Sequence, residues 1–204
     1  MFIHDFDAGD ETEWRAFLAV HPFGELVAGG GPDRNLPVVV PTQYVLAGDD
    51  VLIHLMARNP VWAAIAENPM VVLAVSGDWA FVPSSWKAID EEDPRLGIPT
   101  TYYASVQLAG VATTIEDAEG VASVLRTQLD ALQPDEDVVD PSDHGNRLRV
   151  IRAMRIRVTD VRAKFKYGGN VDRAHRDAVL ARLAQRDGPG DGAAAAHLVR
   201  RIDR

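Results

Sequence analysis

Short strand-like runs separated by tight turns fill the middle of this sequence. The run Phe23–Ala28 ends at three consecutive glycines, and the run Val51–Met56 follows the turn Gly48-Asp49-Asp50. Turns this short join antiparallel strands, and the regular alternation of strands with helices that builds parallel sheets is missing. The pattern predicts a mainly β (α+β) fold of about six or seven antiparallel strands with inserted helices, arranged as a small closed or split barrel, because a barrel protects the edges of its sheet.

Three segments with helical patterns surround these runs. They cover residues 11–20, 116–132 and 172–185, the second inserted between strands and the third near the C-terminus. A glycine-rich break then begins at Gly188. We therefore expect a single barrel domain over residues 1–187 and a flexible tail over residues 188–204.

The composition excludes several classes of protein. The 204 residues contain no cysteine, which excludes disulfides, thiolate catalysis and cysteine-bound metal clusters. The six histidines are scattered, so no metal site is expected. Apolar runs such as Val71–Val75 are too short to cross a bilayer, and the first residues lack the basic start and apolar core of a secretory signal. These features predict a cytoplasmic protein without a membrane segment.

Charge is divided unevenly along a chain whose net charge is −9. Residues 1–145 hold 6 Lys/Arg and 24 Asp/Glu, whereas residues 146–204 hold 15 Lys/Arg and 6 Asp/Glu. The two parts can neutralise each other across the fold or across a dimer, or the basic part can form an anion site. Direct DNA binding is not expected, because no helix-turn-helix with a basic recognition helix stands out and the net charge opposes it.

The segment His54–Pro60 contains the strongest candidate for a phosphate site. A strand ends here, and Asn59-Pro60 has the composition of a helix start. The first N–H groups of a helix lack partners and attract anions, and Arg58 adds a positive charge. The alternative is that Asn59 and Pro60 only cap a helix and that Arg58 is an ordinary surface residue.

Two later segments are also candidates for ligand contacts. Phe81–Trp86 ends a strand with two serines and a tryptophan, which could stack on a planar ring or pack a loop onto the barrel. Lys164 and Lys166 lie two residues apart, so they share one face of a strand. These lysines could contact a phosphate or face water.

Several of these motifs, taken in order, resemble the PaiB family of FMN-binding negative transcriptional regulators. The resemblance runs from about Met1 to Leu183. Its motifs are His54-Leu55, Arg58-Asn59-Pro60 with Trp62, Val82–Trp86, Pro99-Thr100 with Tyr103, and Lys164-Phe165-Lys166 with Asn170. The resemblance implies an antiparallel six-stranded FMN-binding split β-barrel with peripheral helices, a homodimer with flavin at the subunit interface, and a role in transcription regulation. The implied cofactor-binding residues are His54, Ala57, Arg58, Asn59, Ser84, Ser85, Trp86, Tyr103, Lys164 and Lys166.

The chain also departs from the family pattern at polar positions. A Thr-His pair is replaced by Val38-Val39, Trp-Asn by Thr101-Tyr102, a His by Gln107, and Ser-Gln by Gly168-Gly169. Three alternatives therefore stay open for the cofactor: FMN, a weakly bound or different flavin, or none. The corresponding functions are a PaiB-like regulator, a flavin- or deazaflavin-dependent oxidoreductase, and a ligand-free interaction protein on the same barrel.

Overall fold

The computed structural model describes residues 1–202, whose strands form one antiparallel sheet of the split-barrel type. The order of the strands is β2-β1-β5-β6-β7-β4-β3. Their bounds are β1 Phe23–Ala28, β2 Val38–Gln43, β3 Val45–Ala47, β4 Asp50–Met56, β5 Met70–Val82, β6 Thr100–Ile115 and β7 Ile151–Lys166. The described residues thus form seven strands, which agrees with the six or seven that the pattern predicts and is one more than the six-stranded barrel that the resemblance implies. The short β3 pairs with β4.

Helices connect and flank these strands. The α-helices are α1 Glu11–Val20, α2 Val61–Glu67, α3 Ala118–Leu132, α4 Arg173–Arg186 and α5 Asp191–Ile202. Short 3-10 helices occur at η1 Asp5–Asp7, η2 Ser84–Lys87, η3 Pro94–Leu96 and η4 Pro141–Val150. No helix among the described residues combines the length and the apolar composition needed to cross a membrane.

The chain divides into two compact units, which we describe separately. Unit 1 contains residues 1–14, residues 76–106 and the chain from Arg162 onward, whereas unit 2 contains residues 15–75 and 107–161. The long strands β5, β6 and β7 each contribute residues to both units. A single domain over residues 1–187 therefore stays a prediction.

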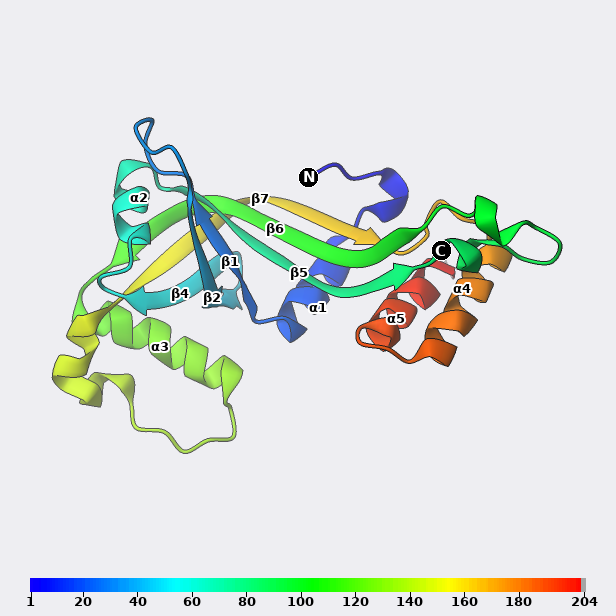
Figure 1. Ribbon diagram of the computed structural model, residues 1–204. Helices are drawn as coiled ribbons and strands as arrows, with labels where there is room; N and C mark the ends of the chain where they lie inside the picture. Colours follow the sequence, from blue (N-terminus) through cyan, green and yellow to red (C-terminus); the bar gives the residue numbers. More distant parts are fainter. Residues whose placement is uncertain (203–204) are drawn as a thin grey trace. The chain divides into compact units, whose positions relative to one another are not determined.

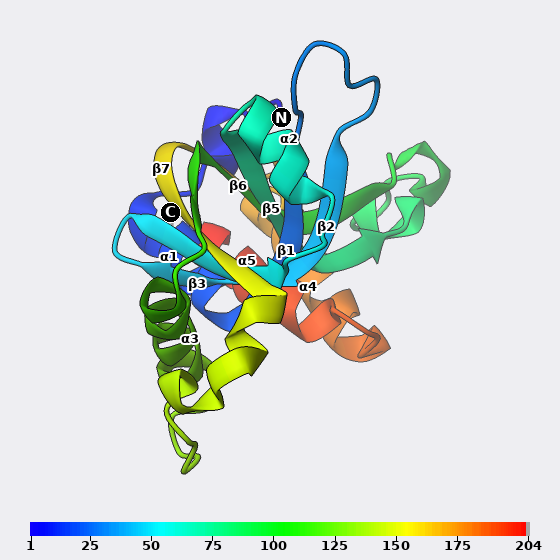
Figure 2. The ribbon, with the colours of Figure 1, turned by 90° about the vertical axis from the view of Figure 1, so that its left-hand side faces the viewer.

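The core of unit 2 forms where α3 covers one face of β4 and β7. These two strands pair antiparallel, with Ile53 opposite Met154. The helix begins at Asp117, whose carboxylate accepts a hydrogen bond from the Gly120 N–H at 2.8 Å. One face of α3 packs into a buried apolar cluster that includes Leu52. Figure 2 shows α3 beneath the sheet with η4 beside it.

The last described part of unit 1 corrects the prediction of a flexible tail from residue 188. Residues 191–202 form α5, which packs beside α4 (Figure 1). Gly190 (φ +83°) turns the chain, and the following alanines favour a helix. Leu198 is fully buried, and His197 Nε2 lies 2.8 Å from Asp78 Oδ2. The last two residues of the predicted tail lie outside the described residues.

Candidate functional site

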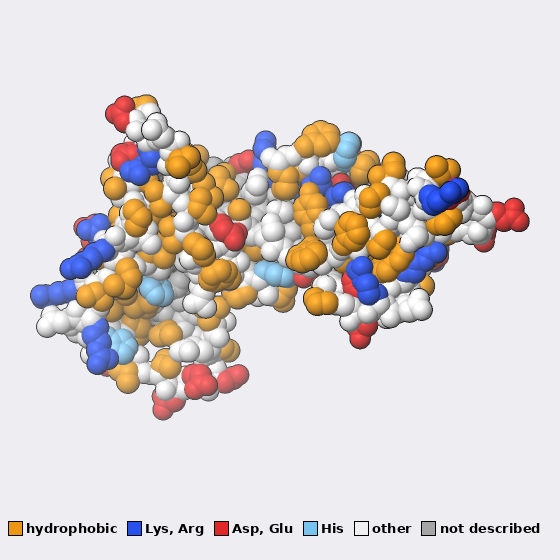
Figure 3. Space-filling view, viewed as in Figure 1, with side chains coloured by type: hydrophobic (Ala, Val, Ile, Leu, Met, Phe, Trp, Pro, Cys, Tyr) orange, Lys and Arg blue, Asp and Glu red, His pale blue; other side chains and the backbone are white. Residues whose placement is uncertain are grey.

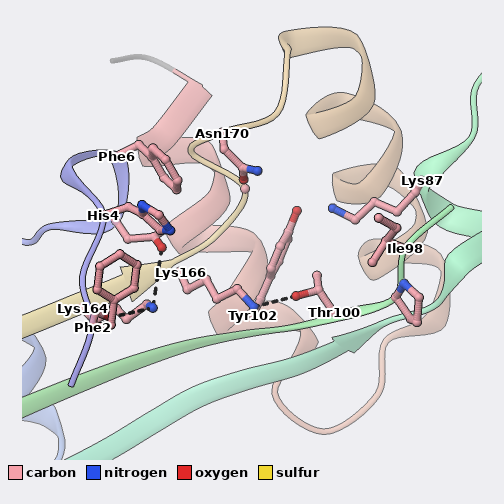
Figure 4. Close-up of a pocket in the computed structure, with 13 residues that line it drawn as sticks. Phe2, His4, Phe6, Lys87, Ile98, Thr100, Tyr102, Lys164, Lys166 and Asn170 are labelled. Atoms are coloured by element: carbon pink, nitrogen blue, oxygen red, sulfur yellow. Dashed lines mark hydrogen bonds and ion pairs between the residues drawn. The ribbon is translucent and has the colours of Figure 1, made fainter.

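All three lysines of the chain line a single pocket in unit 1. The sequence has 21 basic residues, of which only Lys87, Lys164 and Lys166 are lysines. The pocket has a volume of about 370 Å³, within the range of small-molecule sites. Figure 4 shows that its lining comes from the N-terminal segment, from the start of β6, from the end of β7 and from Lys87 at the end of η2. We call this cavity the lysine pocket.

The end of β7 positions two of the lysines as the spacing predicts. Lys164 and Lys166 alternate with the fully buried Phe165, so they share one face of the strand. Their Nζ atoms lie 5.9 Å and 6.0 Å from the centroid of the Tyr103 ring. The structure thus brings together three of the predicted cofactor-binding residues, although Tyr103 itself does not line the lysine pocket.

The three ammonium groups differ in the hydrogen bonds and ion pairs that they make with the rest of the protein. Lys164 Nζ donates to the carbonyl of Phe2 at 3.0 Å and lies 3.8 Å from Asp7 Oδ2. Lys166 Nζ donates to Thr100 Oγ1 at 2.7 Å. The ammonium group of Lys87 makes no hydrogen bond or ion pair with any residue that the structure describes. Three lysines against the single carboxylate of Asp7 leave the pocket with an excess of two positive charges.

Burial affects the charged groups of the pocket. It lowers the pKa of Lys87, and the nearby charge of Lys166 lowers this pKa further. Burial also raises the pKa of Asp7, although Lys164 and Lys166 act in the opposite direction. An anion bound between the lysines would relieve their mutual repulsion, so the electrostatics of the pocket favour an anionic ligand.

The predicted ring-binding segment directly precedes Lys87 in η2 but does not line the lysine pocket. Trp86 packs against Arg186, whose guanidinium carbon lies 4.5 Å from the centroid of the indole ring. Arg182 Nη1 donates to the carbonyl of Ser85 at 3.2 Å. Ser84 begins η2. A cation–π contact thus already uses one face of Trp86, and the contact of this segment with a flavin ring stays a prediction.

The predicted phosphate turn His54–Pro60 lies in unit 2, where its polar groups are largely used. The N–H groups of Ala57 and Asn59 donate to the carbonyls of Val150 and Met56 at 2.8 Å and 2.9 Å. Asn59 Oδ1 accepts from the Val61 N–H at 3.0 Å, which satisfies a donor at the start of the seven-residue helix α2.

The side chains of His54 and Arg58 in the same turn differ in their contacts. His54 Nδ1 lies 2.5 Å from Gln128 Oε1. Arg58 is exposed and makes no hydrogen bond or ion pair with any described residue. The turn therefore presents one solvated guanidinium group rather than the row of free N–H donors that the sequence predicts.

Of the residues that line the lysine pocket, the sequence predicts only Lys164 and Lys166 as cofactor-binding residues, and it misses Lys87 and Tyr102 among others. Lys87 is the only lysine before residue 146, and the scarcity of lysine in the whole chain is the signal that could have found it. In the sequence Tyr102 stands out only as a departure from the family pattern, and no local signal shows that its side chain enters the pocket.

Comparisons with known proteins agree with the split-barrel fold. Residues 1–160 match the model of the family described as "Putative FMN-binding domain". The "Protease synthase and sporulation protein PAI 2" of Bacillus subtilis is 25% identical over 189 residues, which cover 88% of this chain and 86% of that protein. This relative agrees with the family resemblance in the sequence.

Solved structures share the fold at low sequence identity. An FAD and heme binding protein from Mycobacterium smegmatis has a TM-score of 0.62 and 17% identity, over 87% of this chain and 80% of its own. The flavocytochrome Anf3 from Azotobacter vinelandii has a TM-score of 0.56 and 21% identity, over 81% of this chain and 75% of its own. With the family model matching 160 of the 204 residues, the chain belongs to the family described as "Putative FMN-binding domain".

Proposed function

We propose that this protein binds FMN and that the lysine pocket holds the FMN phosphate. The observation that carries the proposal is that all three lysines of an acidic, arginine-rich chain line one pocket. Membership of a family described by FMN binding supports the same ligand.

The donor set of the lysine pocket fits a phosphate monoester. Such a group carries a charge of about −1.5 to −2 at neutral pH, which matches the positive excess that Lys87, Lys164 and Lys166 leave over Asp7. Lysine ammonium groups, the Thr100 hydroxyl and the Asn170 amide can all donate hydrogen bonds to phosphate oxygens. Partial burial strengthens these contacts relative to a solvated cation such as Arg58.

Two further proposals concern what the protein does with a bound flavin. Bound FMN would supply reversible redox chemistry, which serves either an oxidoreductase or a regulator that responds to its flavin. An assay of the flavin-loaded protein with reduced nicotinamide separates them. Oxidation of the nicotinamide would support the oxidoreductase, whereas flavin retention without turnover would favour the regulator.

A homodimer is part of the same proposal. Trp79 and Phe81 lie two residues apart on β5, with 60% and 48% of their surfaces exposed. Figure 3 shows hydrophobic side chains gathered over this part of unit 1. A second copy of the chain would bury such a face, so light scattering at micromolar concentration should give twice the mass of 22.2 kDa. A monomer mass would contradict this proposal.

Comparing FMN with riboflavin tests the proposed function. Both ligands contain the flavin ring, but only FMN carries the phosphate. Charge-assisted hydrogen bonds should make FMN bind more tightly by roughly tenfold to a hundredfold. Quenching of flavin fluorescence measures both affinities. Equal affinities would show that the protein does not recognise the phosphate, and the absence of binding by either ligand would overturn the proposed function.

A further inference from the structure

The hydroxyl group of Tyr102 is buried without a hydrogen-bond partner. The side chain is 1% exposed, and its Oη makes no hydrogen bond to any residue that the structure describes. Leaving a buried hydroxyl unsatisfied costs free energy, and folded proteins keep few such groups. The missing partner of Tyr102 therefore needs an explanation.

The local backbone leaves space at this hydroxyl. Figure 4 shows Tyr102 extending from β6 into the lysine pocket, with Lys87 approaching it from one side. Lys87 Nζ lies 5.5 Å from the centroid of the Tyr102 ring. Gly168 has a φ of +71°, and a Cβ atom at this position would lie 2.6 Å from Tyr102 Oη. Glycine thus both permits the turn and makes room for the hydroxyl.

The groups around the Tyr102 hydroxyl are mainly hydrogen-bond donors. Lys87 has no hydrogen bond or ion pair within the described chain, and Arg176 Nε is also buried without a partner. Burial raises the pKa of Tyr102 to about 12, with Arg176 acting in the opposite direction, so the hydroxyl keeps its proton at neutral pH. Donors without acceptors at one place are complementary to an anion that carries acceptor oxygens.

We propose that Tyr102 and Lys87, together with Asn170 from the lining of the same pocket, form an oxyanion subsite within the lysine pocket. The Tyr102 hydroxyl donates a hydrogen bond to a phosphate or carboxylate oxygen, and Lys87 balances the charge. The bound group is the phosphate of the proposed flavin or the carboxylate of a small organic acid. The subsite requires that the lysine pocket binds anions, but it does not require a flavin.

The test compares Tyr102→Phe with wild type, using inorganic phosphate and acetate as probes at constant ionic strength. Labelling with ¹⁵N-lysine gives three backbone amide signals, all from residues of the pocket. Titration of these signals measures the affinity of each anion. Tyr102→Phe should weaken binding of the preferred anion by roughly tenfold to a hundredfold. A response to phosphate assigns the site to a phosphate ligand, and a response to acetate alone assigns it to a carboxylate.

Thermal unfolding without added anion separates this role from a structural one. Tyr102→Phe removes an unsatisfied hydroxyl, so the unfolding temperature should stay the same or rise. Tyr44→Phe is the matched control, because Tyr44 Oη is also buried but donates to the His21 carbonyl at 2.7 Å. This control should lower the unfolding temperature by about 2–4 °C and leave anion binding unchanged.

Three results would overturn the subsite. These are equal anion affinities of wild type and Tyr102→Phe, the absence of binding by both probes, and a Tyr102→Phe protein as destabilised as Tyr44→Phe. Titration with FMN separates this proposal from the proposed function. If wild type binds phosphate through Tyr102 but does not bind FMN, the proposed function fails and the subsite remains.

Discussion

The lysine pocket of unit 1 and the turn His54–Pro60 of unit 2 are two cationic regions that differ in which of their hydrogen-bond donors the protein satisfies. In the turn, neighbouring protein groups accept the N–H hydrogen bonds of Ala57, Asn59 and Val61. In the pocket, the ammonium group of Lys87 and the hydroxyl of Tyr102 have no hydrogen-bond partner among the described residues. We therefore expect a suitable set of residue types to form a binding site only where the fold leaves its donors available.

The two regions also differ in their exposure to solvent. Arg58 is exposed, so water and salt screen its charge. Lys164 is 8% exposed and Lys87 is partly buried, which makes their interactions with an anion stronger. We therefore expect changes in the lysine pocket to affect FMN binding much more than a change in the turn does.

Lys166→Ala should produce the largest effect. Removing one ammonium group should weaken FMN binding by roughly tenfold to a hundredfold, whereas riboflavin binding should change by less than about twofold. Flavin fluorescence titration measures both affinities. Lys166→Arg is the control that keeps the charge, and it should retain part of the affinity. An equal loss of affinity for FMN and for riboflavin would indicate damage to the fold or to the site that holds the flavin ring.

The pH dependence of binding separates lysine from arginine as the phosphate ligand. The pKa of Lys87 is lowered from the usual 10.5, so this group loses its positive charge before a solvated lysine does. As the pH rises from about 7 to about 10, FMN affinity should fall by roughly tenfold, because the phosphate stays dianionic while the pocket loses charge. Riboflavin corrects for titration of the flavin ring. A flat ratio of the two affinities would favour an arginine site.

Removing the one carboxylate of the pocket should have a smaller effect in the opposite direction. Asp7 Oδ2 lies 3.8 Å from Lys164 Nζ, and the carboxylate offsets part of the positive charge of the pocket. Asp7→Asn keeps the shape of the side chain and should strengthen FMN binding by about twofold to fivefold. Titration calorimetry measures this change. Weaker binding in Asp7→Asn would mean that Asp7 positions Lys164 rather than competing with the ligand.

Arg58→Ala should have the smallest effect. Because this guanidinium group is solvated and the neighbouring N–H groups are occupied, FMN affinity should change by less than about twofold. The same fluorescence titration measures it. A tenfold loss of FMN affinity with unchanged riboflavin binding would indicate that the phosphate binds at the turn His54–Pro60 instead.

Much of the fold follows from local sequence signals. The helix predicted over residues 11–20 matches α1, and the shared face of Lys164 and Lys166 follows from their spacing on a strand. The glycine-rich sequence before α5 predicts a flexible tail, and this prediction is wrong because glycine marks both turns and flexible segments. The stability of α5 depends on buried contacts, such as that of His197 with Asp78, which are distant in sequence.

The candidate site is less predictable for the same reason. Lys87 and Tyr102 reach the lysine pocket from separate segments, and only the folded chain brings them together. Two departures from the family pattern, at Tyr102 and Gly168, also meet there, since a side chain at position 168 would collide with the tyrosine hydroxyl. Each change alone looks like the loss of a polar contact, but together the two changes place a buried hydroxyl in the pocket.

The most direct test of the central claim is a titration of ¹⁵N-lysine-labelled protein with FMN. The spectrum contains three lysine amide signals, and each reports on the lysine pocket. We predict that all three signals shift together and saturate at the FMN affinity measured by fluorescence, with much smaller shifts for riboflavin at equal saturation. Lysine signals that stay unchanged while FMN binds would contradict the claim and place the phosphate elsewhere.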